Sequence, residues 1–177
     1  MSTLAKAIVT DGAGHFELDD IELGDPQQGE VLVEIRASGV CHTDYDSMSW
    51  NRRMIMGREG AGVALSCGDG VSHLRDGDRV LLNWAIPCGD CFQCRAGAEN
   101  ICEQKATVPG ERFRCGGLPL NASFNLGTIA TLAIVPQKAA VKIDMDIPFT
   151  FAAILGCEVM AGFGSVVNTS RVEKGVR

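Results

Sequence analysis

Short apolar segments separated by turn residues run along most of this chain. Val31, Val33 and Ile35 alternate with a second set of side chains at 32, 34 and 36, after a turn at 24–26. This period of two predicts a strand with one well-buried face. The segments 79–82 and 131–135, bounded by turn residues and proline, predict two further short strands.

Two stretches depart from the strand pattern. Residues 149–167 carry Ala, Leu, Met and Phe at helical spacing and predict a helix, whereas 43–54 is polar with scattered large side chains. No repeat, low-complexity tract or linker interrupts the sequence. We therefore expect residues 1–177 to form one mainly β unit with one or two helices.

The composition is that of an ordinary soluble protein, with 46% apolar and 21% charged residues among 177. Sixteen Lys and Arg against 22 Asp and Glu give a net charge of −6, and no basic run stands out. Nucleic acid and anionic membranes are therefore poor partners. No apolar run approaches the roughly 20 residues of a membrane span, and the N-terminus does not read as a secretory signal. We expect a cytoplasmic protein.

Eight cysteines are many for a reducing compartment, where thiols more often serve as metal ligands or catalytic groups than as disulfides. Cys88, Cys91, Cys94 and Cys102 have the spacing C-x2-C-x2-C-x7-C. Such spacing lets four thiolates close a tetrahedron around structural zinc. An iron–sulfur cluster is the rival, but its bacterial run has an x3 gap and a following proline. We expect zinc that holds a lobe together.

A second constellation combines a soft ligand, an imidazole, a hydroxyl and a carboxylate in four consecutive residues, 41–44. Further on come Gly-Arg-Glu-Gly-Ala-Gly at 57–62, Gly-Asp-Arg-Val at 77–80 and Gly-Cys at 156–157, before Gly-Phe-Gly at 162–164. With the four-cysteine lobe, these motifs make the sequence resemble the N-terminal, GroES-like catalytic domain of the zinc-dependent medium-chain alcohol dehydrogenases. The resemblance covers nearly the whole chain.

The resemblance implies a distorted, mainly β (α+β) barrel with a four-cysteine zinc lobe and a few short helices. It implies zinc and NAD as cofactors, a small alcohol or aldehyde as substrate, and a homo-oligomer in the full-length form. It also implies residue roles. Cys41 and Cys157 would be ligands of a catalytic zinc, with Asp44 and Glu59 as carboxylates near it, and the structural zinc would be held by Cys88, Cys91, Cys94 and Cys102. Thr43 would be the hydroxyl that touches the substrate and starts a proton relay. His42 would lie near the cofactor pyrophosphate, and Trp84 would line the substrate pocket.

Arg58 stands where the family pattern has a histidine, the third protein ligand of the catalytic zinc. A guanidinium stays protonated and has no lone pair to donate, and its charge repels Zn²⁺ unless the side chain turns away. Three outcomes are open: Glu59 completes the ligand set with Cys41 and Cys157, water does so, or the site holds no metal. We favour a weakened site with Glu59 as the candidate ligand.

The second departure concerns the nicotinamide site. No G-x-G-x-x-G follows a strand in this sequence, so we expect the chain to stop where a nucleotide-binding domain would begin. Two functions remain. The first is the catalytic-domain portion of an NAD-dependent alcohol dehydrogenase, inactive as an isolated chain. The second is a zinc-stabilised, non-catalytic structural or interaction module with a degenerate catalytic metal site.

Overall fold

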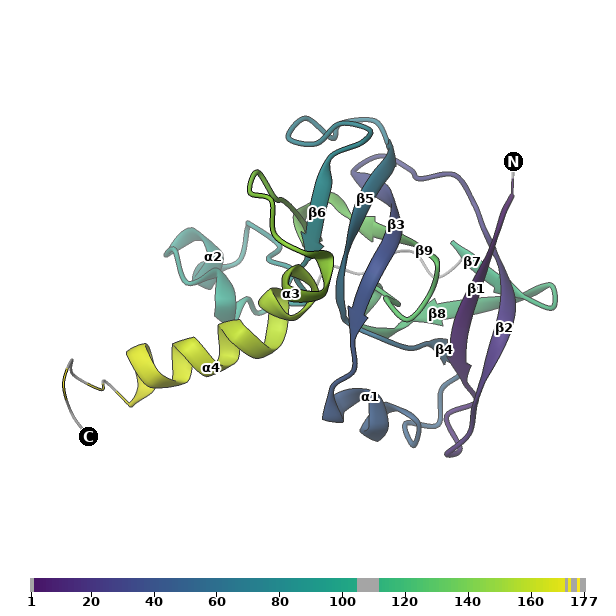
Figure 1. Ribbon diagram of the computed structural model, residues 1–177, viewed down its shortest axis with the longest axis horizontal. Helices are drawn as coiled ribbons and strands as arrows, with labels where there is room; N and C mark the ends of the chain where they lie inside the picture. The colour runs from purple at the N-terminus through teal and green to yellow at the C-terminus, as the bar shows by residue number, and fades with distance from the viewer. Residues whose placement is uncertain (1, 105–111, 171, 173–174, 176–177) are drawn as a thin grey trace.

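The computed structural model describes residues 2–104, 112–170, 172 and 175 (Figure 1). Within these residues the chain forms two β-sheets and a small number of short helices. The strands are β1 (Thr3–Thr10), β2 (Phe16–Leu23), β3 (Glu30–Gly39), β4 (Met54–Ile55), β5 (Glu59–Cys67), β6 (Arg79–Leu82), β7 (Phe113–Cys115), β8 (Leu118–Ala122), β9 (Leu132–Pro136) and β10 (Ala140–Lys142). The predicted mainly β, GroES-like class is confirmed.

The strands divide between a closed barrel and an open sheet. The barrel has the order β1-β2-β7-β8-β4, and the second sheet has the order β10-β6-β5-β3-β9. The long β3–β5 pair is antiparallel, and its register sets Gly39 opposite Glu59. The ends of two separate motifs, at 39–44 and 57–62, are therefore brought together by one pair of strands.

The β3 strand shows why the alternation at 31–36 predicted a strand correctly. Val31 and Val33 are fully buried in one apolar cluster, and Ile35 packs against the same cluster. Leu32 points the other way, toward the apolar cluster inside the barrel. Because β3 carries apolar side chains on both faces, it lies between the two cores. The predicted strands at 79–82 and 131–135 correspond to β6 and, shifted by one residue, to β9.

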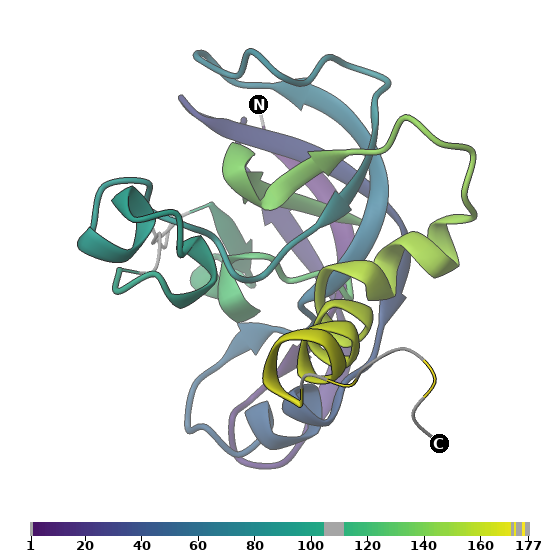
Figure 2. The same ribbon diagram turned by 90° about the vertical axis from the view of Figure 1, so that its left-hand side faces the viewer.

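The helices are short except near the C-terminus. They include α1 (His42–Ser47) and α2 (Phe92–Arg95), followed by α3 (Phe149–Ile154) and α4 (Met160–Gly164). The last two belong to one helical segment, Phe149–Thr169, interrupted by π-helical turns. Figure 2 looks along this segment, whose first turns lie against the open sheet. There Ala152 and Ala153 are buried with Ala61 of β5. The predicted helix at 149–167 is confirmed.

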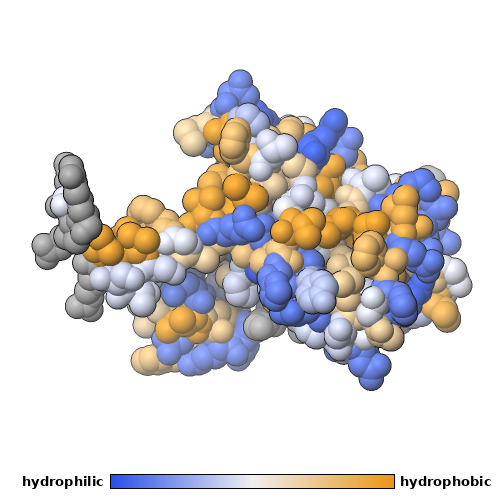
Figure 3. Space-filling model, turned by 60° about the horizontal axis from the view of Figure 1, so that its bottom comes forward, coloured by the Kyte–Doolittle hydropathy of each residue, from blue (hydrophilic) through white to orange (hydrophobic). Residues whose placement is uncertain are grey.

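This helical segment corrects one expectation from the sequence. Its 21 residues are long and apolar enough, by length and composition alone, to cross a membrane. The apolar run is interrupted in the sequence by Thr, Gly, Ser and Asn, but Glu158 is the one charged side chain among residues 149–169. Figure 3 shows apolar surface on this projecting helix, where Phe163 is 67% exposed. Core helices of soluble proteins can be equally long and apolar, so the length and composition of this segment carry no further conclusion.

The cysteine-rich segment forms a lobe of its own. Residues 88–102, which contain α2, stand away from both sheets (Figures 1 and 2). Lys138, beside β9, reaches the lobe and donates a hydrogen bond from Nζ to the Cys88 carbonyl at 2.6 Å. Only Cys91 and Cys94 are buried within the segment. The lobe therefore has almost no apolar core of its own.

Candidate functional site

The four thiols of the lobe converge on one point. The Sγ atoms of Cys88, Cys91, Cys94 and Cys102 all lie within 4.8 Å of one another. The Cys91 N–H donates to the Cys88 sulfur at 3.2 Å, and the Cys94 N–H donates to the Cys91 sulfur at 3.5 Å, at the start of α2. Four thiols at this spacing fit a closed tetrahedral zinc site, which has a structural role because it keeps no open position.

The electrostatics of the lobe call for a cation. Hydrogen bonds from the backbone N–H groups of Cys94 and Glu103 lower the pKa of Cys91 to about 6. Burial raises the pKa of Cys94 to about 12. Because like charges this close oppose one another, the four thiols ionise together only when a metal ion compensates them. The donor set thus suits a divalent metal that prefers thiolates.

A second cluster joins three distant parts of the chain. Cys41 immediately precedes α1, Glu59 begins β5, and Cys157 lies one turn beyond α3. Their ligand atoms all lie within 4.8 Å of one another. Gly39 is required here, because a Cβ on it would collide with the Glu59 carboxylate. Gly156 is required too, because a Cβ there would collide with a backbone carbonyl of β6 and push Cys157 away.

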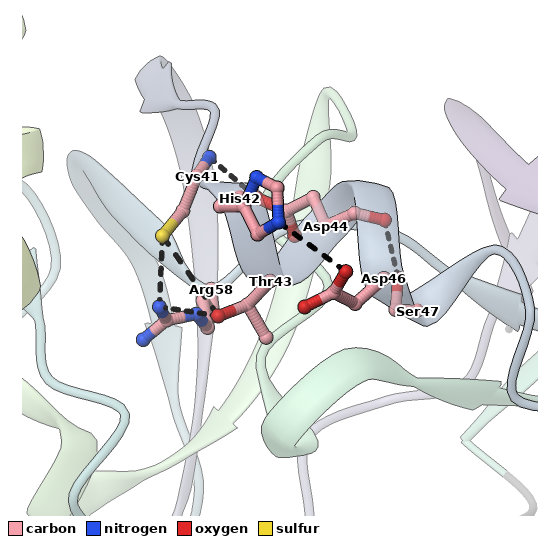
Figure 4. Close-up of polar contacts among 7 residues, drawn as sticks. All are labelled: Cys41, His42, Thr43, Asp44, Asp46, Ser47 and Arg58. Carbon is pink, nitrogen blue, oxygen red and sulfur yellow. Dashed lines mark hydrogen bonds and ion pairs between the residues drawn. The ribbon is translucent and has the colours of Figure 1, made fainter.

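Arg58 points toward this cluster, and Figure 4 shows its guanidinium beside Cys41 and Thr43. Its Nη1 donates to the Cys157 sulfur at 2.9 Å, and its Nη2 donates to the Cys41 sulfur at 2.9 Å. The same Nη2 donates to the Thr43 hydroxyl oxygen, also at 2.9 Å. The guanidinium therefore bridges the two thiols that the sequence resemblance assigns to the catalytic zinc.

Two aromatic rings cover the guanidinium. The Arg58 Cζ lies 5.3 Å from the centre of the Trp84 ring and 5.4 Å from that of Phe124. Both distances are in the range of cation–π attraction. Arg58 as a whole is only 7% exposed. Burial works against its charge, but the sulfur atoms of Cys157 and Cys41 outweigh that effect and raise the pKa of Arg58, so the guanidinium stays charged.

A catalytic zinc does not fit these residues as they are arranged. Zinc would use the lone pairs of the Cys41 and Cys157 sulfurs, which already accept hydrogen bonds from Arg58. Burial also raises the pKa of the Cys157 thiol to about 11. Glu59 is fully buried, and its carboxylate lies against the Cys157 thiol and contributes to the raised pKa of that thiol. Glu59 also lies near enough to Arg58 to help raise the pKa of the guanidinium.

The residues of α1 divide between the site and the solvent. Thr43 is half-buried and touches Arg58, whereas the His42 side chain is 83% exposed and lies 3.5 Å from Asp46. Asp44 is buried and accepts hydrogen bonds from the N–H of Cys41 at 2.9 Å and from that of Gly57 at 3.2 Å. Asp44 therefore ties the start of α1 to the loop before Arg58.

We expect Asp44→Ala to destabilise the fold, because it leaves two N–H groups without their carboxylate acceptor. The loss is about 3 kcal/mol in the free energy of unfolding, measured by urea denaturation. Asp46→Ala is the matched control on the same helix, since its carboxylate is exposed and pairs with the exposed His42, and it should cost less than about 0.5 kcal/mol. Equal losses in the two variants would contradict this role for Asp44.

Trp84 lines a cavity next to the cluster. The cavity has a volume of about 210 Å³, and its wall also includes Phe124, Ile86 and Cys102. The Trp84 and Phe124 rings meet edge to face with their centres 5.5 Å apart. One side of these rings faces Arg58, so the cavity and the Arg58 cluster share a wall.

Two parts of the site, the Phe124–Asn125 turn and Thr128, are not among the candidates that the sequence offers. Phe124 has φ 50° and ψ 27°, and Asn125 also has a positive φ. This left-handed backbone is uncommon for a bulky residue, and such strain occurs at functional sites. Thr128 is fully buried and contacts the Ser38 hydroxyl at 2.9 Å beside Glu59. The Phe-Asn pair in a turn is the one sequence signal that could have marked this segment.

Comparisons with known proteins identify relatives among the alcohol dehydrogenases. Residues 27–145 match the alcohol dehydrogenase GroES-like domain. The chain is 34% identical over 173 residues to "Alcohol dehydrogenase B" of Mycobacterium tuberculosis, an alignment that covers 90% of this chain and 46% of that protein. It is also 34% identical to an "NDMA-dependent alcohol dehydrogenase" of Amycolatopsis methanolica, covering 96% and 49%. The chain thus spans about half the length of these relatives.

A solved structure points to the same family. The alcohol dehydrogenase zinc-binding domain protein from Burkholderia ambifaria superposes with a TM-score of 0.89 at 30% identity, covering 99% of this chain and 51% of that one. The family match extends over more than half of the sequence and contains the four-cysteine lobe and most of the second cluster. The chain belongs to the zinc-dependent medium-chain alcohol dehydrogenase family, of which it carries the GroES-like domain.

Proposed function

We propose that this chain is the catalytic-domain portion of an oxidoreductase that interconverts a small alcohol and its aldehyde or ketone with NAD. One observation carries the proposal. The Thr43 hydroxyl accepts a hydrogen bond from the Arg58 guanidinium, and the Trp84 and Phe124 rings that contact this guanidinium form a wall of the neighbouring cavity. A hydroxyl and a fixed positive charge next to an apolar cavity suit a substrate whose reacting atom is an oxygen.

The hydrogen bond between Arg58 and Thr43 leaves the Thr43 hydrogen free to be donated. Because the Thr43 oxygen accepts from Nη2, its own hydrogen is available for the reacting oxygen of a substrate bound beside it. As a carbonyl is reduced, Thr43 gives this proton to the oxygen that gains charge, and Arg58 stabilises the developing negative charge. Thr43 acts as a relay: in reduction it takes a replacement proton from water as it gives its own, and in alcohol oxidation it receives the alcohol proton as it passes its own to water. NAD, when bound, supplies or accepts the hydride.

Two further residues have supporting roles in this proposal. We propose that the exposed imidazole of His42 contacts a phosphate group of the cofactor, and that Asp44 positions Thr43 by holding the start of α1. The four-cysteine lobe holds a structural zinc. We propose that residues 1–177 are one catalytic domain, followed in the full-length protein by a nucleotide-binding domain that carries most of the NAD site. We also propose a homo-oligomeric full-length form in the cytoplasm.

A chimera tests the proposed function. This chain replaces the matching half of the Mycobacterium alcohol dehydrogenase, and NADH is followed by absorbance with a panel of small alcohols and, in reverse, aldehydes. We expect turnover that Thr43→Val lowers by about 10² to 10⁴-fold, the range for general acid–base groups. Thr43→Ser keeps the hydroxyl and should retain most of the rate. A folded chimera whose turnover is unchanged by Thr43→Val would contradict the role of Thr43.

The second candidate is a zinc-stabilised module without catalysis, and the burial of Arg58 favours it. The two Nη atoms already donate to Cys157, Cys41 and Thr43. A centre whose donors are taken up by protein groups polarises a substrate less well. A chimera that folds and binds NAD, yet turns over neither alcohols nor aldehydes, would support this second candidate against the first.

A further inference from the structure

The cluster at Cys41, Glu59 and Cys157 already has a cation of its own. Arg58 approaches each sulfur with a different nitrogen, and both distances are 2.9 Å. A zinc ion would have to lie about 2.3 Å from the same two sulfurs. The guanidinium and the metal therefore compete for the same lone pairs, and a guanidinium cannot serve as a ligand itself.

Several contacts hold Arg58 in this position. Trp84 and Phe124 cover its guanidinium, and Thr43 accepts a third hydrogen bond. To admit a metal, the side chain would have to give up all of these contacts. Arg58 is buried in this position, at 7% exposure, so leaving it also means giving up packed apolar contact.

The cluster holds a buried carboxylate as well as the guanidinium. Glu59 is fully buried, lies against the Cys157 thiol, and is close enough to Arg58 to act on its charge. A buried carboxylate of this kind needs a compensating positive charge close by. Arg58 is the buried cation next to the cluster, and its Nη atoms lie against the two thiols rather than against the carboxylate.

We propose that the Arg58 guanidinium is the resident cation of the Cys41–Glu59–Cys157 cluster and replaces the catalytic zinc, so that this chain binds one zinc ion, in the four-cysteine lobe. Arg58 is the residue that excludes the metal. Replacing it by histidine removes the competing cation and adds a neutral nitrogen ligand beside two thiols and a carboxylate, a donor set that suits zinc. The readout is metal content, so the proposal succeeds or fails independently of the substrate and of activity.

The test is zinc per chain, measured by elemental analysis after dialysis against excess zinc and removal of the unbound ion. We expect one zinc for the wild-type chain and two for Arg58→His. The double variant Arg58→His/Cys41→Ser should return to one, and Cys67→Ser, a half-buried thiol outside both clusters, should leave the wild-type value unchanged. Two zinc ions in the wild-type chain would overturn the proposal, as would one zinc in a folded Arg58→His variant.

Two further variants locate the zinc even if Arg58→His does not fold. If the proposal holds, Cys157→Ser keeps one zinc, because Cys157 ligates no metal in this chain. Cys91→Ser loses the zinc altogether, because it removes one of the four lobe thiols. A Cys157→Ser variant that loses zinc relative to the wild-type chain would show that the second cluster holds metal despite Arg58, and the proposal would be wrong.

Discussion

Removal of zinc from the four-cysteine lobe is expected to unfold residues 88–102 while leaving both sheets folded. The lobe has almost no alternative source of stability: within it only Cys91 and Cys94 are buried, and Phe92 and Ile101 are exposed. Its helices are one turn each. Without the metal, the conformational entropy of these residues is not offset by buried apolar area. Structural zinc contributes about 10–16 kcal/mol in zinc-finger peptides, far more than the lobe's other contacts can provide.

Hydrogen exchange with and without a strong chelator measures this effect. Amides of the lobe that are protected with zinc should exchange without protection after chelation, or in the Cys91→Ser variant. The amides of β3 and β5 should keep their protection, and Cys67→Ser should behave like the wild-type chain. Acid should have the same effect as chelation, because zinc binding requires the thiolates and each thiol regains its proton as the pH falls. A lobe that stays protected without zinc would contradict a structural role for the metal.

Truncation of Arg58 is expected to have the second largest effect. Arg58→Met keeps much of the side-chain volume but leaves the buried Glu59 carboxylate without its neighbouring charge. Loss of one partner of a buried charged pair costs about 3–5 kcal/mol. We expect a loss of this size in the free energy of unfolding by urea, measured with one zinc equivalent per chain so that free metal cannot substitute for the guanidinium.

Two matched variants separate charge from packing. Arg36→Met removes an arginine from an exposed pair with Glu34 and should cost less than about 1 kcal/mol. The double variant Arg58→Met/Glu59→Gln removes both charges, and it should recover part of the stability that Arg58→Met loses. A loss below about 1 kcal/mol in Arg58→Met, or no recovery in the double variant, would show that Arg58 does not compensate Glu59.

The parts of the fold that the sequence predicts well are those that depend on neighbouring residues. The alternation around Val31 and Val33 follows from the two-residue period of a strand and corresponds to β3. The cysteine spacing likewise brings four thiols together within one short segment. The apolar character of Phe149–Thr169 is harder to recognise from the sequence, because small polar residues interrupt the apolar run without adding charge.

The direction of the Arg58 side chain could not be predicted in this way. It depends on Cys157, which is 99 positions away in sequence, and on Phe124, whose left-handed backbone places its ring over the guanidinium. The sequence shows that Arg58 stands where a zinc ligand is expected, but three outcomes for the metal site stay open at that level. The tertiary structure adds the missing contacts: the guanidinium points inward and meets both thiols.

This chain is proposed to carry one zinc ion, in the four-cysteine lobe, and the Arg58 guanidinium where the family resemblance implies a second zinc ion. The most direct test is an anomalous difference map at the zinc absorption edge from crystals of the wild-type chain grown with excess zinc. We predict a single strong peak among the sulfurs of Cys88, Cys91, Cys94 and Cys102, with Arg58 density between Cys41 and Cys157. A second zinc peak between those two sulfurs, with Arg58 turned away, would contradict the account.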